Sequence, residues 1–186
     1  MIWLIVLLAI VLVIVIAIVA LYNRFVRLRN RVDNSWAQIE VQLKRRWDLI
    51  PNLIETVKGY AAHERETFQN VTEARARAQQ AGTPGQTAEA EGFLSQALGR
   101  LFAVAEAYPE LQADENFRQL QTELAETENR IAVSRQVYND SVLTYNNAVQ
   151  TFPGVVLAGP FGFSIREFFD VEDVAQREPP RVDFAR

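Results

Sequence analysis

Two stretches of this sequence combine charged, amide and aromatic side chains in patterns that could bind a ligand. In the first, two guanidinium groups, a carboxylate and a carboxamide surround Pro51; they belong to Arg45, Arg46, Asp48 and Asn52. In the second, a Tyr-Asn pair recurs after seven residues, or two helical turns, so Asn139 and Asn146 share one helix face. We call these six residues the candidate polar seam. Two roles stay open for it: a polar layer that fixes helix register, with Asn52 facing the other two asparagines, and a ligand pocket.

Catalytic chemistry has little support in the sequence. There is no Cys and a single His, which excludes a thiolate nucleophile and a multi-histidine metal site within one chain. His63 beside Glu64 and Glu66 could act as a base or a weak metal site, although a solvated helix surface is the expected setting of such a group. No zinc-protease, phosphate-loop, serine-hydrolase or dinucleotide motif is present. We predict that the protein is not an enzyme and that it binds no cofactor and no metal.

A further charged cluster joins three carboxylates to two guanidinium groups. Its members are Glu123, Glu126, Glu128, Arg130 and Arg135. The spacing of four residues between Glu126 and Arg130 is that of an ion pair on a helix surface, and we expect such pairs rather than carboxylate chemistry.

The elements that position these residues begin with an apolar run. Residues 1–22 hold no charged residue, no Gly and no Pro, and about 20 apolar residues of helix span the hydrocarbon core of a bilayer. We therefore predict a transmembrane helix over residues 1–22. A buried core helix is disfavoured because the run is apolar on every side. A cleaved signal peptide is disfavoured because no basic residue precedes the run and Ile18 stands where cleavage needs a small residue.

The charge distribution predicts how the chain lies across the membrane. Residues 23–46 hold seven basic and two acidic residues, whereas residues 47–186 hold 12 basic and 21 acidic ones. Four arginines close to the apolar run form what we call the membrane collar: Arg24, Arg27, Arg29 and Arg31. This basic flank predicts an external N-terminus, a cytoplasmic C-terminal domain and contact between the collar and lipid headgroups. The acidic remainder argues against a nucleic-acid partner.

Beyond the apolar run, hydrophobic residues recur at heptad-like spacings of three and four, which is typical of helices that pack together and of coiled coils. The first such segment continues from Tyr22 to about Gln80. The second starts at a Thr83 cap and ends near Ala107, and the third runs from an Asp114 cap to Phe152. The sequence predicts an all-α fold in which the transmembrane helix continues into an antiparallel up-and-down bundle, with three long helices and a short C-terminal fourth.

The lengths of these helices do not match. The first would extend about 90 Å beyond the membrane and the second about 33 Å, so apolar stripes would stay uncovered. Either the first helix breaks near Pro51 or Gly59, or the stripes pack against other copies of the chain. Pro51 also removes the amide that would bond to the carbonyl of Trp47. We expect Asn52 or an arginine to satisfy that carbonyl inside a kinked, continuing helix.

The C-terminal part of the chain has a different composition, rich in Gly and aromatic residues. Ser164 and Glu167 predict a short helix over Ile165–Asp170, followed by an extended tail. The predicted domains are the transmembrane helix 1–22, the bundle 23–163, and the C-terminal helix and tail 164–186. Four phenylalanines outside the main helices could contact the bundle, the membrane or a neighbouring subunit: Phe161, Phe163, Phe168 and Phe169.

Several motifs, in order along the chain, resemble the LemA family of bacterial membrane-anchored proteins. They are RRWDLIPNLIETVKGYAAHE (45–64), EAYPEL (106–111), residues 116–146, FPGVVLA (152–158) and Val182-Asp183-Phe184. The resemblance implies a single-pass protein of the bacterial inner (plasma) membrane with a short external N-terminus and a cytoplasmic four-helix up-and-down bundle. It implies no assignable enzymatic activity, and for some relatives it implies a role in membrane shaping or biogenesis.

These observations leave two hypotheses for the function. The first is a membrane-anchored structural or scaffold protein that self-associates and organises or remodels the bilayer. Its partners would be the lipid bilayer, further copies of itself and a membrane protein. The alternative is a membrane-anchored binding or adaptor module whose polar seam recognises a ligand or a partner peptide.

Overall fold

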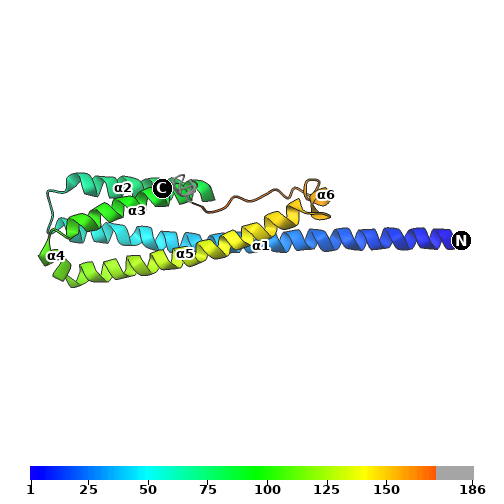
Figure 1. Cartoon of the computed structure of the whole chain (residues 1–186), viewed down its shortest axis with the longest axis horizontal. Helices are drawn as coiled ribbons and strands as arrows, with labels where there is room; N and C mark the ends of the chain where they lie inside the picture. Colours follow the sequence, from blue (N-terminus) through cyan, green and yellow to red (C-terminus); the bar gives the residue numbers. More distant parts are fainter. Residues whose placement is uncertain (171–186) are drawn as a thin grey trace, which may run out of the picture.

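The computed structural model of the chain describes residues 1–170, and within them every regular element is a helix. The helices are α1 (Ile2–Lys58), α2 (Arg65–Gln80), α3 (Pro84–Ala105), α4 (Pro109–Ala113), α5 (Glu115–Gln150) and α6 (Gly154–Ala158). Four of them, α1, α2, α3 and α5, run up and down beside one another, and the first part of α1 projects from the bundle as a bare rod (Figure 1). The predicted all-α bundle behind a long apolar helix is confirmed.

The first predicted helix is two helices in the structure. α1 passes through Pro51 and ends at Lys58, and α2 begins at Arg65 after a turn that opens with Gly59. This break resolves the mismatch of lengths. The part of α1 beyond Tyr22 becomes as long as the 36-residue α5, and α2 folds back beside the 22-residue α3. The fourth helix of the bundle is therefore α2.

The bundle contains two hydrophobic cores stacked along its length. The distal core lies where the end of α1 meets α2, α3, α4 and the start of α5, and includes Ile50, Leu53, Leu94, Leu101 and Leu111. The membrane-proximal core lies between α1, α5 and α6, and includes Phe25, Ile39, Val142, Tyr145 and Phe163. The α2–α3 hairpin covers the distal core and reaches the proximal core only at the start of α3, through Ala88, so the proximal core needs another element to close it.

The predicted starts of α3 and α5 are confirmed. The Thr83 hydroxyl accepts a hydrogen bond from the Gln86 amide at 3.3 Å, with Pro84 in the first turn. The Asp114 carboxylate accepts from the Phe117 amide at 2.9 Å. The Tyr60 hydroxyl also donates to Asp114, at 3.0 Å, and so ties the α1–α2 turn to the start of α5.

The prediction of a helix over Ile165–Asp170 is wrong. Residues 164–170 are extended, and we call them the C-terminal strap; the short helix α6 lies before them in the chain. The strap follows α5 and closes the proximal core where the α2–α3 hairpin ends (Figure 1). Its backbone groups are satisfied by side chains of α5, which removes the need for helical hydrogen bonds. The tail predicted from Val171 onward lies outside the described residues.

Candidate functional site

Two asparagines of the predicted seam hold the C-terminal strap. Asn146 donates to the Arg166 carbonyl at 2.9 Å and accepts from the Arg166 amide at 2.8 Å. Asn139 does the same with Phe169, at 3.1 Å and 3.0 Å. Each carboxamide thus replaces the hydrogen-bonding edge that a neighbouring strand would supply. Asn52 does not take part, since its side chain is exposed on α1 and its carbonyl accepts from Thr56. The expected pairing of Asn52 with these asparagines is wrong.

The seven-residue spacing of the asparagines matches the geometry of an extended chain. Seven residues of α-helix rise about 10.5 Å, and three residues of extended backbone, here from Arg166 to Phe169, span about 10 Å. The Tyr138 hydroxyl adds a third bond to the strap by donating to the Glu167 carbonyl at 2.8 Å. Burial raises the pKa of Tyr138 to about 12, so the phenol keeps its proton for this bond at neutral pH.

Aromatic side chains fix the strap and the segment before it on α1. The Phe169 ring lies 5.7 Å from Trp36, centroid to centroid, and the Phe163 ring lies 5.1 Å from Phe25. Both phenylalanines are buried, whereas Phe161 and Phe168 are 45% and 40% exposed. The Arg166 guanidinium reaches Asp33 on α1 at 2.9 Å. Two of the four C-terminal phenylalanines therefore belong to the bundle core.

A buried ion cluster surrounds Arg46 in the middle of the bundle. Its guanidinium binds Glu91 at 2.8 Å, Glu128 at 2.9 Å and the Ser95 hydroxyl at 2.8 Å. Arg46 and Glu91 have only 6% and 7% of their side chains exposed, and the Trp47 indole donates to the second Glu91 oxygen at 2.7 Å. Burial raises the pKa of Glu91 and outweighs the positive charge of Arg46 and the hydrogen bonds from Trp47 and Arg46, which lower it. The cluster joins α1, α3 and α5 at one level.

The carbonyl that Pro51 leaves free is satisfied by an arginine. Arg75 on α2 donates from Nε to the Trp47 carbonyl at 2.8 Å. This agrees with the expectation that either Asn52 or an arginine would take that place. The proline therefore creates an acceptor on α1 that α2 uses when it folds back.

The remaining charged members of the seam lie on the surface. Asp48 pairs with Lys44 one turn before it, at 3.3 Å, with both side chains largely exposed. Arg45 stands 3.9 Å from Glu123 in a solvated contact. The six predicted seam residues thus divide into the buried Arg46, the two strap-holding asparagines and three exposed side chains, and they do not line one common pocket. Glu128 pairs across the bundle with Arg46, not along its own helix.

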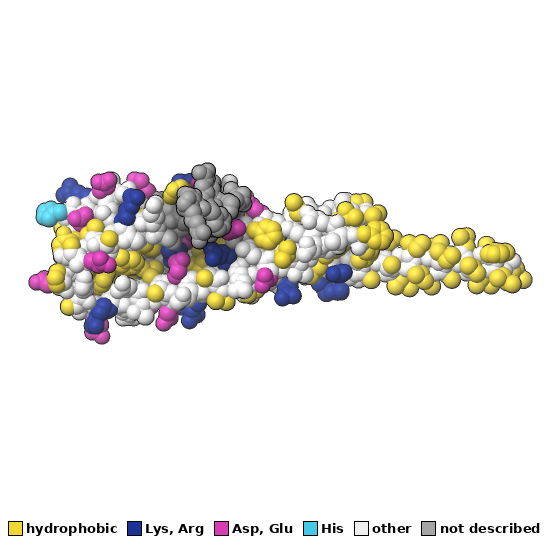
Figure 2. Space-filling view, in the orientation of Figure 1, with side chains coloured by type: hydrophobic (Ala, Val, Ile, Leu, Met, Phe, Trp, Pro, Cys, Tyr) yellow, Lys and Arg dark blue, Asp and Glu magenta, His cyan; other side chains and the backbone are white. Residues whose placement is uncertain are grey.

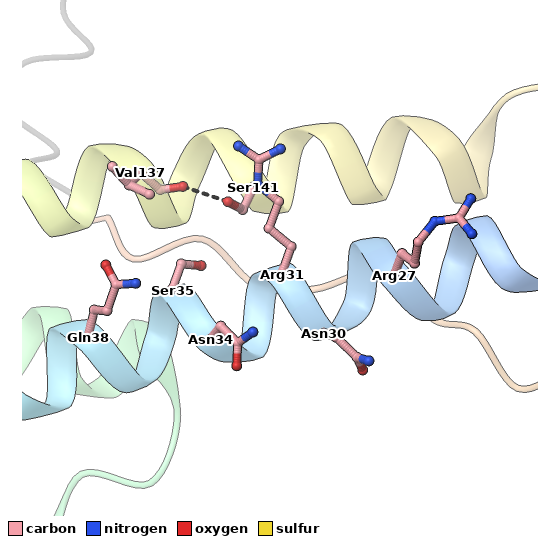
Figure 3. A pocket seen from close by; sticks show the side chains of 8 residues that line it. All are labelled: Arg27, Asn30, Arg31, Asn34, Ser35, Gln38, Val137 and Ser141. Atoms are coloured by element: carbon pink, nitrogen blue, oxygen red, sulfur yellow. Dashed lines mark hydrogen bonds between the residues drawn. The ribbon is translucent and has the colours of Figure 1, made fainter.

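The membrane collar borders an open groove between α1 and α5, on the face opposite the strap. The groove measures about 350 Å³ and is lined by Arg27, Asn30, Arg31, Asn34, Ser35, Gln38, Val137 and Ser141. Figure 3 shows Arg31 reaching from α1 across Ser141, with Arg27 on the same side and Asn30 pointing away. Within residues 1–170, neither Arg27 nor Arg31 forms an ion pair. Arg29 has a different contact, because its guanidinium lies 5.4 Å from the centre of the Phe163 ring.

The bare part of α1 has the properties of a membrane span. It is the one helix among the described residues that is long and apolar enough to cross a bilayer, and none of its apolar stretch is buried. Figure 2 shows this rod covered by hydrophobic side chains, with basic side chains at its junction with the bundle. A single apolar helix that runs straight into an up-and-down bundle defines the class of membrane-anchored helical-bundle proteins.

The chain belongs to the LemA family, whose model matches residues 35–184. It is 30% identical over 174 residues to Magnetosome protein MamQ 2 of Paramagnetospirillum magneticum, an alignment that covers 80% of this chain and 64% of that protein. It is 29% identical, with the same coverage, to Magnetosome protein MamQ of Magnetospirillum gryphiswaldense. Protein LemA of Metamycoplasma hominis is 25% identical over 131 residues, or 70% of this chain and 60% of that protein. The chain thus spans less than two thirds of the length of these relatives.

Sequence reasoning missed the partners of Arg46 and of the strap. Glu91 lies three residues before Leu94, which places it on the apolar stripe of α3. This spacing could have indicated that Glu91 is buried. Ser95 carries no such signal, because its contact with Arg46 depends on how α3 docks on α1. The extended strap competes with a capping pattern that favours a helix, and no local feature of residues 164–170 decides between the two.

Proposed function

We propose that this protein is a membrane-anchored structural protein that self-associates and organises or remodels the bilayer around it, without catalysing a reaction. The continuity of α1 carries the proposal, since one helix runs from Ile2 through both cores to Lys58. At the junction the Tyr22 ring lies 5.4 Å from Phe161 and 5.6 Å from Phe163. A bundle joined to its anchor in this way transmits lateral packing to the bilayer, which a domain on a flexible linker would not do.

The proposed orientation follows from the collar. Arg24, Arg27 and Arg31 are exposed directly after the apolar part of α1, where basic residues favour the cytoplasmic side and anionic headgroups. The bundle would then face the cytoplasm from the inner (plasma) membrane of a bacterium, with the N-terminus outside.

The face with the open groove is the proposed contact between copies. On this face Val133 and Val137, one helical turn apart on α5, are 65% and 43% exposed. Val137 borders the groove, and the small, buried side chains of Ser35 and Ser141 form its floor. An apolar ridge next to a shallow groove is self-complementary across a two-fold axis. A second copy held upright by its own anchor presents the same ridge at the same height.

Cysteine cross-linking tests this proposal directly, because the natural chain has no Cys. Val133→Cys should give a cross-linked dimer in native membranes. A matched variant on the strap, Ile165→Cys, has a similarly exposed side chain (60%) and should give little cross-linking. The double variant Val133→Glu/Val137→Glu should shift the detergent-solubilised protein toward the monomer. If the natural protein is a monomer at micromolar concentration in detergent and position 133 gives no cross-link in membranes, the proposal is contradicted.

The alternative function, a binding or adaptor module, is favoured by one observation. Asn139 and Asn146 bind backbone groups and not side chains, so an extended segment of a partner could form the same bonds as the strap. Separate Arg46→Met and Asn139→Ala variants test this alternative. If both lose partner binding only in proportion to their loss of melting temperature, their role is architectural and the adaptor hypothesis fails.

A further inference from the structure

Exposed apolar side chains gather at the end of the bundle that faces the membrane. Phe152 is 83% exposed, Val155 53%, Val156 61% and Phe161 45%. We call these four residues, on the α5–α6 turn, on α6 and just after it, the membrane tip. Figure 2 shows hydrophobic side chains at this end of the bundle, next to the bare part of α1. Within residues 1–170 no other element covers the tip.

The tip stands at the level where the anchor leaves the bilayer. A Cβ added at Gly154 would lie 3.0 Å from the Phe25 ring, and the Phe161 ring lies 5.4 Å from Tyr22. Tyr22 is the last residue of the apolar run, and Phe25 lies three residues beyond it. The headgroup layer adds about 5–8 Å beyond the hydrocarbon core, or about four residues of helix. Residues 22–25 therefore cross this layer, and Figure 1 shows α6 beside that part of α1.

The composition of the tip suits insertion into this layer. Residues 151–163 contain no charged side chain, so moving them toward the acyl chains requires no desolvation of an ion. The buried members of α6, Gly154 and Ala158, face the bundle, which leaves the bulky Val155 and Val156 on the outer side. Exposed Arg24 and Arg27 at the same end of the bundle are complementary to anionic headgroups.

We propose that the membrane tip inserts into the headgroup–acyl boundary of the leaflet from which the bundle emerges. The bundle then contacts the bilayer at two points, through α1 and through α6, and these two contacts set its tilt. The inference rests on the membrane anchoring contained in the proposed function and does not require self-association. The tip's continuity with the membrane span favours lipid over a second copy of the chain as its occupant.

A fluorescent label at single cysteines tests the insertion. The Val156→Cys variant of the 186-residue chain carries an environment-sensitive fluorophore in nanodiscs of phosphatidylethanolamine and phosphatidylglycerol, at one copy per disc. Val133→Cys is the matched control, because its side chain is equally exposed on the bundle but far along α5 from the membrane. The label at position 156 should emit at shorter wavelength and be quenched by lipids with a nitroxide near the headgroup. It should be several-fold less accessible to iodide than the label at position 133.

Each outcome of this measurement decides the proposal. Equal iodide quenching of the two labels in single-copy discs would overturn it. A shift at position 156 that occurs only in discs with several copies would also overturn it and would make the tip an interface between copies. A shift at position 133 in the multi-copy discs reports self-association separately, so the two ideas can fail independently. Adding Phe152→Asp should return the label at position 156 toward the aqueous emission with little change in Tm; an unchanged signal would contradict insertion through the apolar tip.

Discussion

Asn146 holds Arg166 by the backbone, with one carboxamide that donates to the carbonyl at 2.9 Å and accepts from the amide at 2.8 Å. Asn139 repeats the arrangement one heptad earlier with Phe169. Since both ends of each carboxamide are used, neither Asp nor Leu can replace these asparagines without leaving a polar group of the strap unsatisfied. The strap in turn closes the proximal core with Phe169, next to Trp36.

Asn146→Ala should release the strap locally and lower the free energy of unfolding by about 1–3 kcal/mol, because two partly buried hydrogen bonds are lost. Hydrogen exchange checks the mechanism, since the Arg166 amide should lose most of its protection. Asn146→Asp should be at least as harmful, because a carboxylate accepts from the amide but repels the carbonyl.

Asn147→Ala is the matched control, because Asn147 is the exposed neighbour on the same turn of α5. It should change stability by less than about 0.5 kcal/mol. If the Arg166 amide remains protected in Asn146→Ala, the strap is held by its aromatic contacts and not by the asparagine.

Arg46→Met should be strongly destabilising, by about 3–5 kcal/mol, because it leaves Glu91 buried without its counter-charge. Adding Glu91→Leu should recover much of that loss, since an apolar pair of similar volume no longer carries a buried charge. Chemical denaturation of the two single variants and the double variant gives the coupling energy. Arg45→Met is the control: because Arg45 lies in a solvated contact, its loss should lower the free energy of unfolding by at most about 1 kcal/mol. If the free-energy changes of the variants at positions 46 and 91 simply add, the two residues are not a coupled pair.

Arg75→Met should cost about 1–3 kcal/mol in the natural background, because the Trp47 carbonyl loses its donor. With Pro51→Ala the residue at position 51 regains an amide that can bond to the same carbonyl within α1. The cost of Arg75→Met should therefore be smaller in the Pro51→Ala background. The two denaturation differences measure this directly, and equal costs would show that Arg75 acts through packing alone.

Much of the fold follows from local sequence patterns. The apolar run, the stripes with spacings of three and four, and the caps at Thr83 and Asp114 predict the helices and their order. A break near Pro51 or Gly59 is one of the two solutions that the mismatch of helix lengths leaves open, and the structure has it at Gly59. The structure places the break there because the Pro51 position keeps its helix, with Arg75 of α2 satisfying the free carbonyl.

The candidate site was less accessible from sequence. The asparagine repeat at positions 139 and 146 indicates a polar face on α5, but its partner is backbone, which has no signature in the sequence. The extended form of the strap is likewise not predictable from its own sequence. Ser164 and Glu167 favour a helix locally, and the extended form is selected by tertiary contacts from Asn146, Tyr138 and Trp36. Long-range hydrogen bonds to the backbone of the strap therefore outweigh its local preference for a helix.

The hold of Tyr138 on the strap should weaken at alkaline pH. The folded-state pKa of Tyr138 is about 12, above the value of about 10 for an unfolded chain, since burial disfavours the phenolate. Its contribution to stability is therefore complete below pH 10 and is lost as the pH rises through 12. Tyr138→Phe should be less stable at pH 8, without the bond to Glu167, but its stability should fall less steeply between pH 10 and 12. Denaturation at a series of pH values, compared with the natural protein, isolates this difference; parallel curves would contradict it.

Gly154→Ala should separate α6 from the bundle. A Cβ at this position would collide with the Ala148 carbonyl oxygen of α5 and would press on the Phe25 ring of α1, and neither backbone nor buried ring can yield without a shift of α6. We expect a loss of about 1–3 kcal/mol in thermal or chemical unfolding in detergent. Gly159→Ala is the matched control, because a Cβ there meets nothing within 4 Å, and it should be close to neutral. Since Gly154 is what allows α6 to lie against α1 at the level of the anchor, equal stabilities of the two variants would mean that this contact does not hold α6 in place.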